Sequence, residues 1–138
     1  MQDKDTAPTT PAETTVYYDG SCALCSAEIG FYASRPGSCH LRFVDVSDPE
    51  AETGPDLDQD SAMRRFHVRL PDGSLTSGAR GFLAVWHALP GWRWAARLGQ
   101  ARGVALVLEG LYRLFLPIRP TLSRIAAWLG AKPRNPRA

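Results

Sequence analysis

Apolar residues recur along this chain with two different periods, which separate the predicted strands from the predicted helices. In the segment 65–70, Phe66, Val68 and Leu70 alternate with arginine and histidine, which is the pattern of a half-buried strand. This pattern, together with short β-branched or aromatic runs, predicts strands at 15–18, 41–46, 65–70 and 75–76. Spacings of three and four predict helices at 22–34, 79–89, 92–102, 103–116 and 120–129.

Glycine and proline punctuate these segments. Gly78 is expected to open one helix and Pro90 to end it, and Pro117 is expected to end the apolar helix that begins at Gly103. Pro71-Asp72-Gly73 is turn chemistry, so residues 65–77 are predicted to form a hairpin. The acidic segment between the second and third strands is expected to be a solvated connection.

The order of elements predicts the fold class. A strand, a helix and a second strand suit a right-handed parallel crossover, and the hairpin completes a mixed four-stranded sheet. We therefore expect an α/β protein with a thioredoxin-like β-α-β-β-α core and extra C-terminal helices. Residues 15–129 are predicted to be a single domain, with a disordered tail at 1–14 and a basic tail at 130–138.

Charge is distributed unevenly along the 138 residues. Residues 1–60 carry 3 basic and 12 acidic side chains, whereas residues 61–138 carry 13 basic and 2 acidic ones. The arginines are spread singly and match no nucleic-acid motif, so no nucleic-acid partner is expected. In a compact fold much of this split is expected to be internal complementarity, which leaves the basic C-terminal end unbalanced.

The apolar helix predicted at 103–116 has two interpretations. It packs across the second face of the sheet or against a partner protomer, since that face needs a cover. Alternatively, with Arg119, Arg124 and the basic tail, it makes a peripheral contact with an anionic membrane surface. A simple membrane span is not expected, because no run of 18 apolar residues occurs.

The cysteines indicate the compartment and the chemistry. Three cysteines do not make a disulfide scaffold, and the first residues lack the pattern of a secretory signal, so a cytoplasmic protein is predicted. Cys22 and Cys25 lie two residues apart, where a strand ends and a helix begins. Gly20 allows a tight turn, and Ser21 is expected to cap the helix.

A cysteine in the first turn of a helix is stabilised as the thiolate by the helix dipole and by free backbone N–H groups. Cys22 is therefore the predicted nucleophile, and Cys25, on the same helix face, is placed to resolve a mixed disulfide. Asp19 has two possible roles, as a general base toward Cys25 or as a cap of the turn. No metal or organic cofactor is required.

Each of these features also has a structural or non-catalytic interpretation. The cysteine pair could be half of a zinc site, although Cys39, His40, His67 and His87 do not supply a second pair at the usual spacing. Cys39 is expected to be an inert small hydrophobe. The cluster of Trp86, Trp92 and Trp94 is predicted to pack in the core, and the cysteine motif could be a relic in a non-catalytic interaction module.

Several segments together resemble one family. The run from Val16 to Cys25 is similar to the start of the DCC family of thiol-disulfide oxidoreductases, whose Asp, Cys and Cys match Asp19, Cys22 and Cys25. The resemblance covers roughly residues 15–116, and it continues through 41–45, 66–68, 72–73, 77–79, 89–92 and 112–113. It implies a thioredoxin-like fold and dithiol–disulfide exchange, but no particular substrate. A protein or small-molecule thiol or disulfide is the expected partner.

The chain also departs from related proteins. Thioredoxin has tryptophan before its first cysteine and a proline before its third strand, whereas this chain has Ser21 and the proline-free segment 61–64. After Tyr112 the sequence becomes apolar where the family is usually polar, so the role of the C-terminal end stays open.

Overall fold

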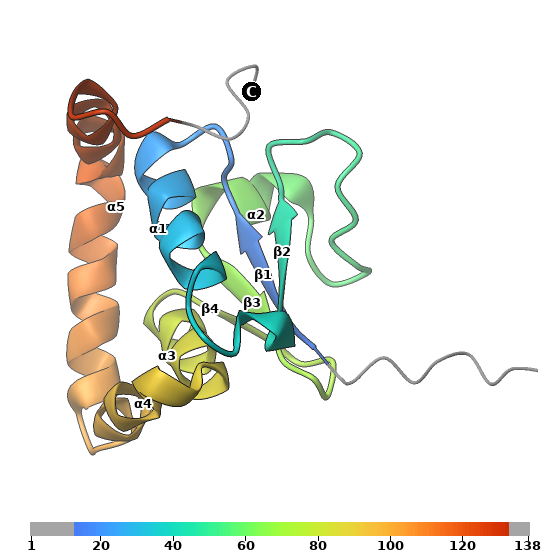
Figure 1. The fold of residues 1–138 in the computed structure, drawn as a ribbon, viewed down its shortest axis with the longest axis vertical. Coiled ribbons are helices and arrows are strands. Elements are labelled where there is room, and N and C mark those ends of the chain that lie inside the picture. The colour runs from blue at the N-terminus through green and yellow to red at the C-terminus, as the bar shows by residue number, and fades with distance from the viewer. Residues whose placement is uncertain (1–12, 133–138) are drawn as a thin grey trace, which may run out of the picture.

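A computed structural model describes residues 13–132 and arranges them as a four-stranded sheet with helices on both faces (Figure 1). The principal elements are β1 (Thr14–Tyr18), α1 (Ala23–Ala33), β2 (Leu41–Asp45), α2 (Gln59–Arg64), β3 (His67–Arg69), β4 (Leu75–Ser77), α3 (Ala79–Ala88), α4 (Arg93–Gly99) and α5 (Val104–Trp128). Short 3-10 turns at Ser38–His40 and Pro90–Trp92 precede β2 and α4. The predicted tail at 1–14 lies mostly outside the described residues, but Thr14 belongs to β1.

The sheet has the strand order β2-β1-β3-β4. β1 and β2 are parallel, with Thr14 opposite Leu41 and Tyr18 opposite Asp45, whereas β1–β3 and β3–β4 are antiparallel. This confirms the predicted mixed four-stranded sheet and hairpin, and it is consistent with a thioredoxin-like fold. Because β1 and β2 run in register, Tyr18 and Asp45 finish at the same edge of the sheet.

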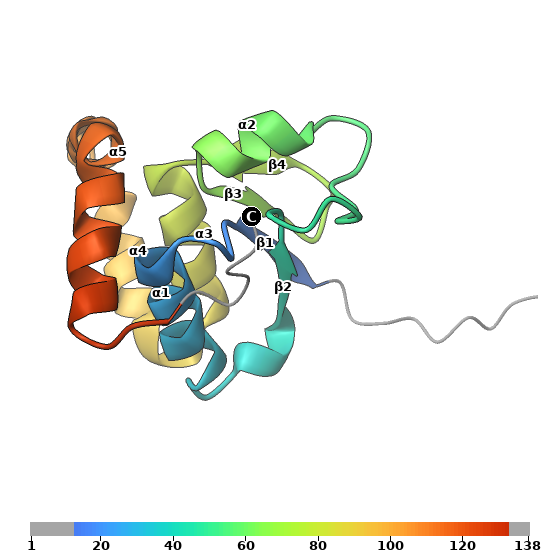
Figure 2. The same cartoon turned by 90° about the horizontal axis from the view of Figure 1, so that it is seen from above.

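The two faces of the sheet are covered differently (Figure 2). Val16, buried on one face, packs with Ile29 of α1 and Val85 of α3. Tyr17, its neighbour in β1, points to the other face and packs with Leu57 and with α2. The second face is therefore covered by α2 and the preceding loop, and the expectation that the helix at 103–116 would cover it is wrong.

α5 packs instead against α1 and α3, as an outer layer beyond them (Figure 1). Only one side of this long helix is used in packing. On that side Tyr112 is buried, and its hydroxyl accepts a hydrogen bond from the Phe66 backbone N–H at 2.8 Å. α5 packs on these helices and not on the sheet, because both faces of the sheet are already covered.

The predicted break at Pro117 is also wrong, because α5 continues through both Pro117 and Pro120. A proline inside a helix removes one backbone hydrogen bond and favours a bend. Both prolines are exposed, so water can satisfy the carbonyls that lose their partners. Figures 1 and 2 show that the last part of α5 turns from its original direction toward the start of α1.

The acidic segment between β2 and α2 is tied to the hairpin. Asp56 forms an ion pair with Arg69 of β3 at 2.5 Å, and the same guanidinium donates to the carbonyl of Thr53 at 2.9 Å. Arg69 also donates to the Tyr17 hydroxyl at 3.1 Å. These contacts join the acidic half of the chain to the basic half, as the charge distribution suggested. Salt screening and the exposure of Asp56 limit their contribution to stability.

The tryptophan cluster is only partly confirmed. Trp86 and Trp92 stack with ring centroids 6.1 Å apart, and the Trp86 indole N–H donates to the Tyr32 hydroxyl at 3.2 Å. Trp94, in contrast, is 63% exposed and does not belong to the core. The difference follows from α4, which turns that side chain outward.

Candidate functional site

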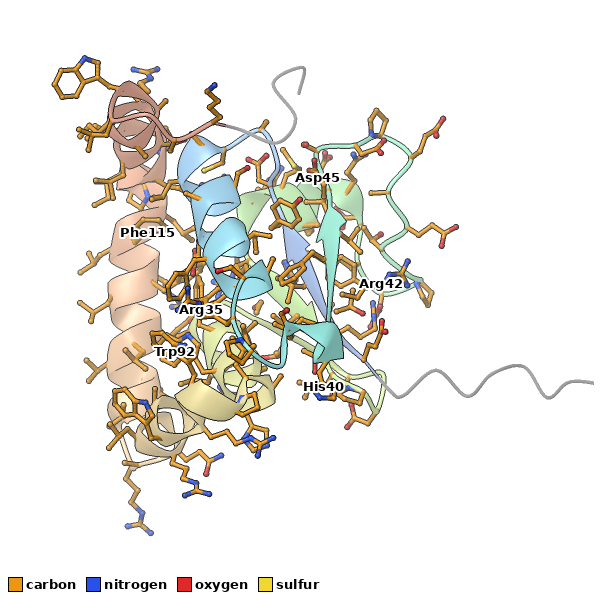
Figure 3. The ribbon with its side chains drawn as sticks, viewed as in Figure 1. Arg35, His40, Arg42, Asp45, Trp92 and Phe115 are labelled. Carbon is orange, nitrogen blue, oxygen red and sulfur yellow. The ribbon has the colours of Figure 1, made fainter. Side chains whose placement is uncertain are left out.

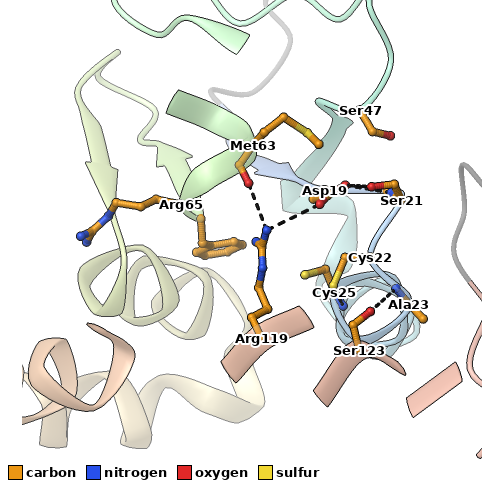
Figure 4. A network of polar contacts seen from close by, with 12 residues as sticks. Asp19, Ser21, Cys22, Ala23, Cys25, Ser47, Met63, Arg65, Arg119 and Ser123 are labelled. Atoms are coloured by element: carbon orange, nitrogen blue, oxygen red, sulfur yellow. Dashed lines mark hydrogen bonds and ion pairs between the residues drawn. The ribbon is translucent and has the colours of Figure 1, made fainter. Parts of the chain in front are cut away.

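The cysteine pair lies where β1 ends and α1 begins, at the carboxyl edge of the parallel strands (Figure 4). The expectation that Ser21 caps the helix is wrong, because Cys22 is itself the N-cap residue. The Cys22 sulfur accepts the backbone N–H of Cys25 at 3.3 Å. A sulfur at this position takes the place of the oxygen that usually caps a helix, so the end of the helix acts directly on the thiol.

Ser21 has a different partner. Its backbone N–H and its hydroxyl both donate to Oδ1 of Asp19, at 2.9 and 2.5 Å. The same turn follows β2, where the N–H and hydroxyl of Ser47 donate to Oδ1 of Asp45 at 2.9 and 2.5 Å. Both parallel strands thus end in an Asp-x-Ser turn, a repeat that is visible in the sequence and could have marked Asp45 as part of the site.

Asp45 holds the loop that carries the cysteines. Its Oδ1 also accepts the Gly20 backbone N–H at 2.8 Å, which links the end of β2 to the loop after β1. A Cβ atom on Gly20 would lie 2.0 Å from Oδ2 of Asp45. Glycine is therefore required by this close approach, and not by the tight turn that the sequence suggested.

The last part of α5 contributes two side chains that the sequence analysis did not assign to the site. The Ser123 hydroxyl accepts the Ala23 backbone N–H at 3.0 Å and also hydrogen-bonds the Cys22 sulfur. Arg119 reaches between the helices, where its guanidinium lies 3.7 Å from Oδ2 of Asp19 and donates to the carbonyl of Met63 at 3.2 Å (Figure 4). Both residues are about one hundred positions from the cysteines, so no local pattern points to them.

These contacts shift the acidity of Cys22. Hydrogen bonds from the Cys25 thiol, from Ser123 and from the Cys25 backbone, with the positive charge of Arg119, lower the pKa of Cys22 from 9.0 to about 6 against the opposing effect of burial. The side chain retains 7% of its surface exposed and borders an open cleft of about 250 Å³. Arg119, Pro120 and Ser123 form the opposite side of this cleft.

Cys25 lies in a contrasting environment. Its thiol donates to Cys22, and this hydrogen bond, burial and the charge of Cys22 all raise the pKa of Cys25. Cys25 lines a small cavity of about 40 Å³ that it shares with Asp19, Glu28 and Arg119. The two sulfurs therefore differ in acidity and in surroundings. Cys22 borders the open cleft and Cys25 borders the smaller cavity, although Cys25 is the less buried residue of the two.

Glu28 is a second acidic group in this cavity that the sequence analysis did not assign. It follows Cys25 by three residues on α1, a spacing that places both side chains on the same side of the helix. The Tyr32 hydroxyl donates to its Oε1 at 2.9 Å, and burial raises the pKa of Glu28 above its ordinary value. The helical spacing was the available signal in the sequence.

The two roles considered for Asp19 can now be compared with its contacts. Asp19 is buried, with 9% of its surface exposed. Its Oδ1 is occupied by Ser21, and its Oδ2 faces Arg119. The hydrogen bonds to Ser21 are those of a capped turn, whereas a role as a base toward Cys25 stays a prediction.

The described side chains contain no group of three or more His, Cys, Asp or Glu arranged to hold a metal ion. The side chain of Cys39 lies outside those described, so the interpretation of that residue stays a prediction. In the structure Cys22 and Cys25 are free thiols.

A strand, a helix capped by a cysteine and a second cysteine one turn later define a class of protein, the thioredoxin-like proteins that carry a Cys-x-x-Cys motif. Within that class, residues 16–125 match the model of the DCC1-like thiol-disulfide oxidoreductase family. The chain belongs to this family, as the resemblance implied, and the match extends through Arg119 and Ser123. Neither a curated protein nor a solved structure matches the chain.

Proposed function

We propose that the protein exchanges a dithiol for a disulfide, with Cys22 as the attacking thiolate and Cys25 as the resolving thiol. One observation carries this proposal: the sulfur with the lowered pKa is also the sulfur that borders the open cleft. With a pKa of about 6, Cys22 would be about 90% thiolate at pH 7. Thiolates, not thiols, attack disulfides.

The proposed reaction transfers two electrons in two displacement steps. The Cys22 thiolate attacks one sulfur of a substrate disulfide, forming a mixed disulfide and releasing the other substrate sulfur as a thiolate. Cys25 then gives its proton to the released thiolate or to water and attacks the Cys22 sulfur, which forms the Cys22–Cys25 disulfide and releases the second substrate thiolate. The substrate disulfide is reduced, and the cysteine pair is oxidised; a second thiol compound would restore the pair by the reverse steps.

The raised pKa of Cys25 suits this sequence. Its two largest electrostatic causes, the hydrogen bond to Cys22 and the charge on Cys22, depend on a thiolate at Cys22. When Cys22 is tied up in a mixed disulfide that charge is gone, so the pKa of Cys25 falls when Cys25 has to react. Burial still raises the pKa of Cys25 in that state, so the need for a base is reduced and not removed. We assign Asp19 a positioning role through Ser21 and Arg119.

Gly20 and Ser21 complete the proposed site, because they shape the loop that carries Cys22. The substrate is proposed to be a protein or a small-molecule disulfide that fits the cleft beside Arg119. No metal, organic cofactor or nucleic acid takes part. A reducing compartment, the cytoplasm, would supply the thiol that restores the pair.

The proposal is tested by trapping, in a Cys39→Ser background that leaves only the pair. Oxidised glutathione serves as the probe, and mass-tagged maleimide counts thiols before and after reduction. Cys25→Ser is expected to accumulate a mixed disulfide with glutathione, whereas Cys22→Ser is expected to accumulate little. The reverse pattern would exchange the two roles. A pair that never forms a reversible disulfide would favour the non-catalytic interaction module.

The role of Asp19 is tested separately. If Asp19 is a positioning residue, Asp19→Asn changes the pH profile of Cys22 alkylation, because it alters the charge beside Arg119. If it is the base for Cys25, the variant slows the decay of the mixed disulfide and leaves the alkylation profile unchanged. Stopped reactions resolved by mass spectrometry measure both rates in one experiment.

A further inference from the structure

The outer side of α4 and α5 is apolar and uncovered in the described part of the chain. All but one of the exposed large hydrophobic side chains lie on or next to these two helices, and Phe31 of α1 is the exception. They are Trp94, Leu98, Leu106, Val107, Leu111, Leu114, Ile118, Ile125, Trp128 and Leu129. Scattered exposed leucines are ordinary on a protein surface, but a contiguous set of this size indicates an interaction surface.

The apolar residues of α5 follow the helical period. Positions 107, 111, 114, 118, 125 and 129 are separated by three, four or seven residues, which places them on one side of the helix. The opposite side of the helix points to the interior, where it contributes Tyr112, Phe115 and Arg119 to the lining of the small cavity. Figure 3 shows side chains projecting from the outer side of α5, away from the sheet. We call this outer side the α5 stripe.

Positive charge borders the α5 stripe. Residues 93–132 include exposed basic side chains at Arg93, Arg97, Arg102, Arg113, Arg124 and Lys132. The same range contains a single acidic residue, Glu109, and it is turned inward. Its carboxylate pairs with Arg65 at 2.5 Å and accepts the Ala79 backbone N–H at 3.1 Å. It also lies 3.4 Å from the exposed Arg113 guanidinium and partly balances that charge, which leaves the other five basic side chains as the border. The outer surface therefore combines exposed apolar side chains with a net positive border.

We propose that the α5 stripe binds peripherally to an anionic lipid surface. An apolar helical face with a basic border is the arrangement that lies in the plane of a bilayer interface, with leucines among the acyl chains and arginines near the phosphates. Within residues 13–132, no helix combines the length and hydropathy needed to cross a membrane. The contact is therefore along the surface.

Charge distinguishes this partner from a second copy of the chain. A symmetric dimer formed through the α5 stripe would place basic borders against each other, and that face offers no exposed acidic side chain to compensate. An anionic bilayer supplies the opposite charge. Because the inner side of the same helix carries Arg119 and Ser123, docking would hold the Cys22 cleft at the edge of the lipid surface.

The test is sedimentation of the full chain with vesicles of phosphatidylcholine alone or mixed with phosphatidylglycerol. Binding is expected only to the anionic vesicles and to weaken at high salt. Leu111→Gln, Leu114→Gln and Ile118→Gln together are expected to weaken it about a thousandfold or more, from the loss of three buried apolar side chains. These side chains are exposed, so the fold does not depend on them.

A charge pair of variants provides the matched control. Arg102→Gln with Arg124→Gln is expected to weaken binding about 25-fold, because each arginine near an anionic surface contributes about fivefold. Arg42→Gln with Arg64→Gln removes the same charge elsewhere and is expected to have little effect. Equal losses in the two pairs would overturn the proposal, since they would indicate attraction by net charge alone.

The wild-type protein gives an independent measurement. Trp128 is 85% exposed, so its fluorescence is expected to shift to the blue on anionic vesicles and to be quenched by brominated lipid. Trp128→Phe should remove most of this shift. No binding to anionic vesicles, or equal binding to neutral ones, would overturn the proposal. A concentration-dependent dimer abolished by the triple variant, without vesicle binding, would assign the α5 stripe to a second copy instead.

Discussion

Ser123 provides the most direct way to test how α5 acts on the cysteine pair. Its hydroxyl hydrogen-bonds the Cys22 sulfur, and Ser123→Ala removes that bond without adding volume. A hydrogen bond to a charged group contributes about 1.5–3 kcal/mol, and one pKa unit corresponds to about 1.4 kcal/mol. Because Cys22 borders an open cleft, the lower end of this range applies. The pKa of Cys22 should therefore rise by about one unit.

The assay is the rate of alkylation by iodoacetamide as a function of pH, with the modified residue located by fragment mass spectrometry. Near pH 6.5, the thiolate fraction and the rate should fall about threefold in Ser123→Ala. Ser123→Thr keeps the hydroxyl and should retain the wild-type midpoint. Thr121→Ala, an exposed change on the same helix, serves as the control. An unchanged midpoint in Ser123→Ala would refute the assignment of this hydrogen bond.

Three further predictions follow from the same contacts. Gly20→Ala should destabilise the protein by about 2–3 kcal/mol in urea unfolding, because its Cβ displaces the carboxylate that holds the loop, whereas Gly30→Ala, with open space around it in α1, should be neutral or stabilising. Replacing Pro117 and Pro120 together by alanine should increase the helicity measured by circular dichroism. It should also raise the pKa of Cys22, because a straighter α5 withdraws its side chains from the sulfur. An unchanged alkylation midpoint would show that the bend is irrelevant to the site. The free energy of unfolding of the reduced protein should rise by about 2 kcal/mol between pH 6 and pH 8. The folded-state pKa of Cys22 is lowered from 9.0 to about 6, so this stabilisation is complete above pH 9 and absent below pH 6. Cys22→Ser should lose this gain.

The site shows which parts of the chemistry are local. The pairing of a strand end, a turn and two cysteines is contained in seven consecutive residues from Asp19 to Cys25, and its interpretation as a helix N-terminus was correct. The details of capping were not. Serine is the common capping residue, so Ser21 was the reasonable choice, but its hydroxyl is bound by Asp19 and the sulfur of Cys22 has the capping position instead.

The contribution of α5 shows where local patterns stop. Pro117 is a strong signal for the end of a helix, and two separate helices were predicted from it. The structure keeps one helix through both prolines, which are exposed to solvent, and the bend brings Ser123 and Arg119 to the cysteines. Which side of a helix faces solvent depends on what it packs against, and that information is not contained in the residues around the proline.

The sequence by itself determined the order of strands and helices along the chain, the mixed sheet and the position of the cysteine pair, because hydrophobic periods, turn residues and helix starts act over a few residues. The tertiary structure alone decided which layer covers which face of the sheet and which distant side chains reach the thiols. Those outcomes depend on packing between segments about one hundred residues apart. The lowered pKa of Cys22 depends on both the local sequence and the tertiary structure. The helix terminus is local, whereas the hydrogen bond from Ser123 comes from a distant segment.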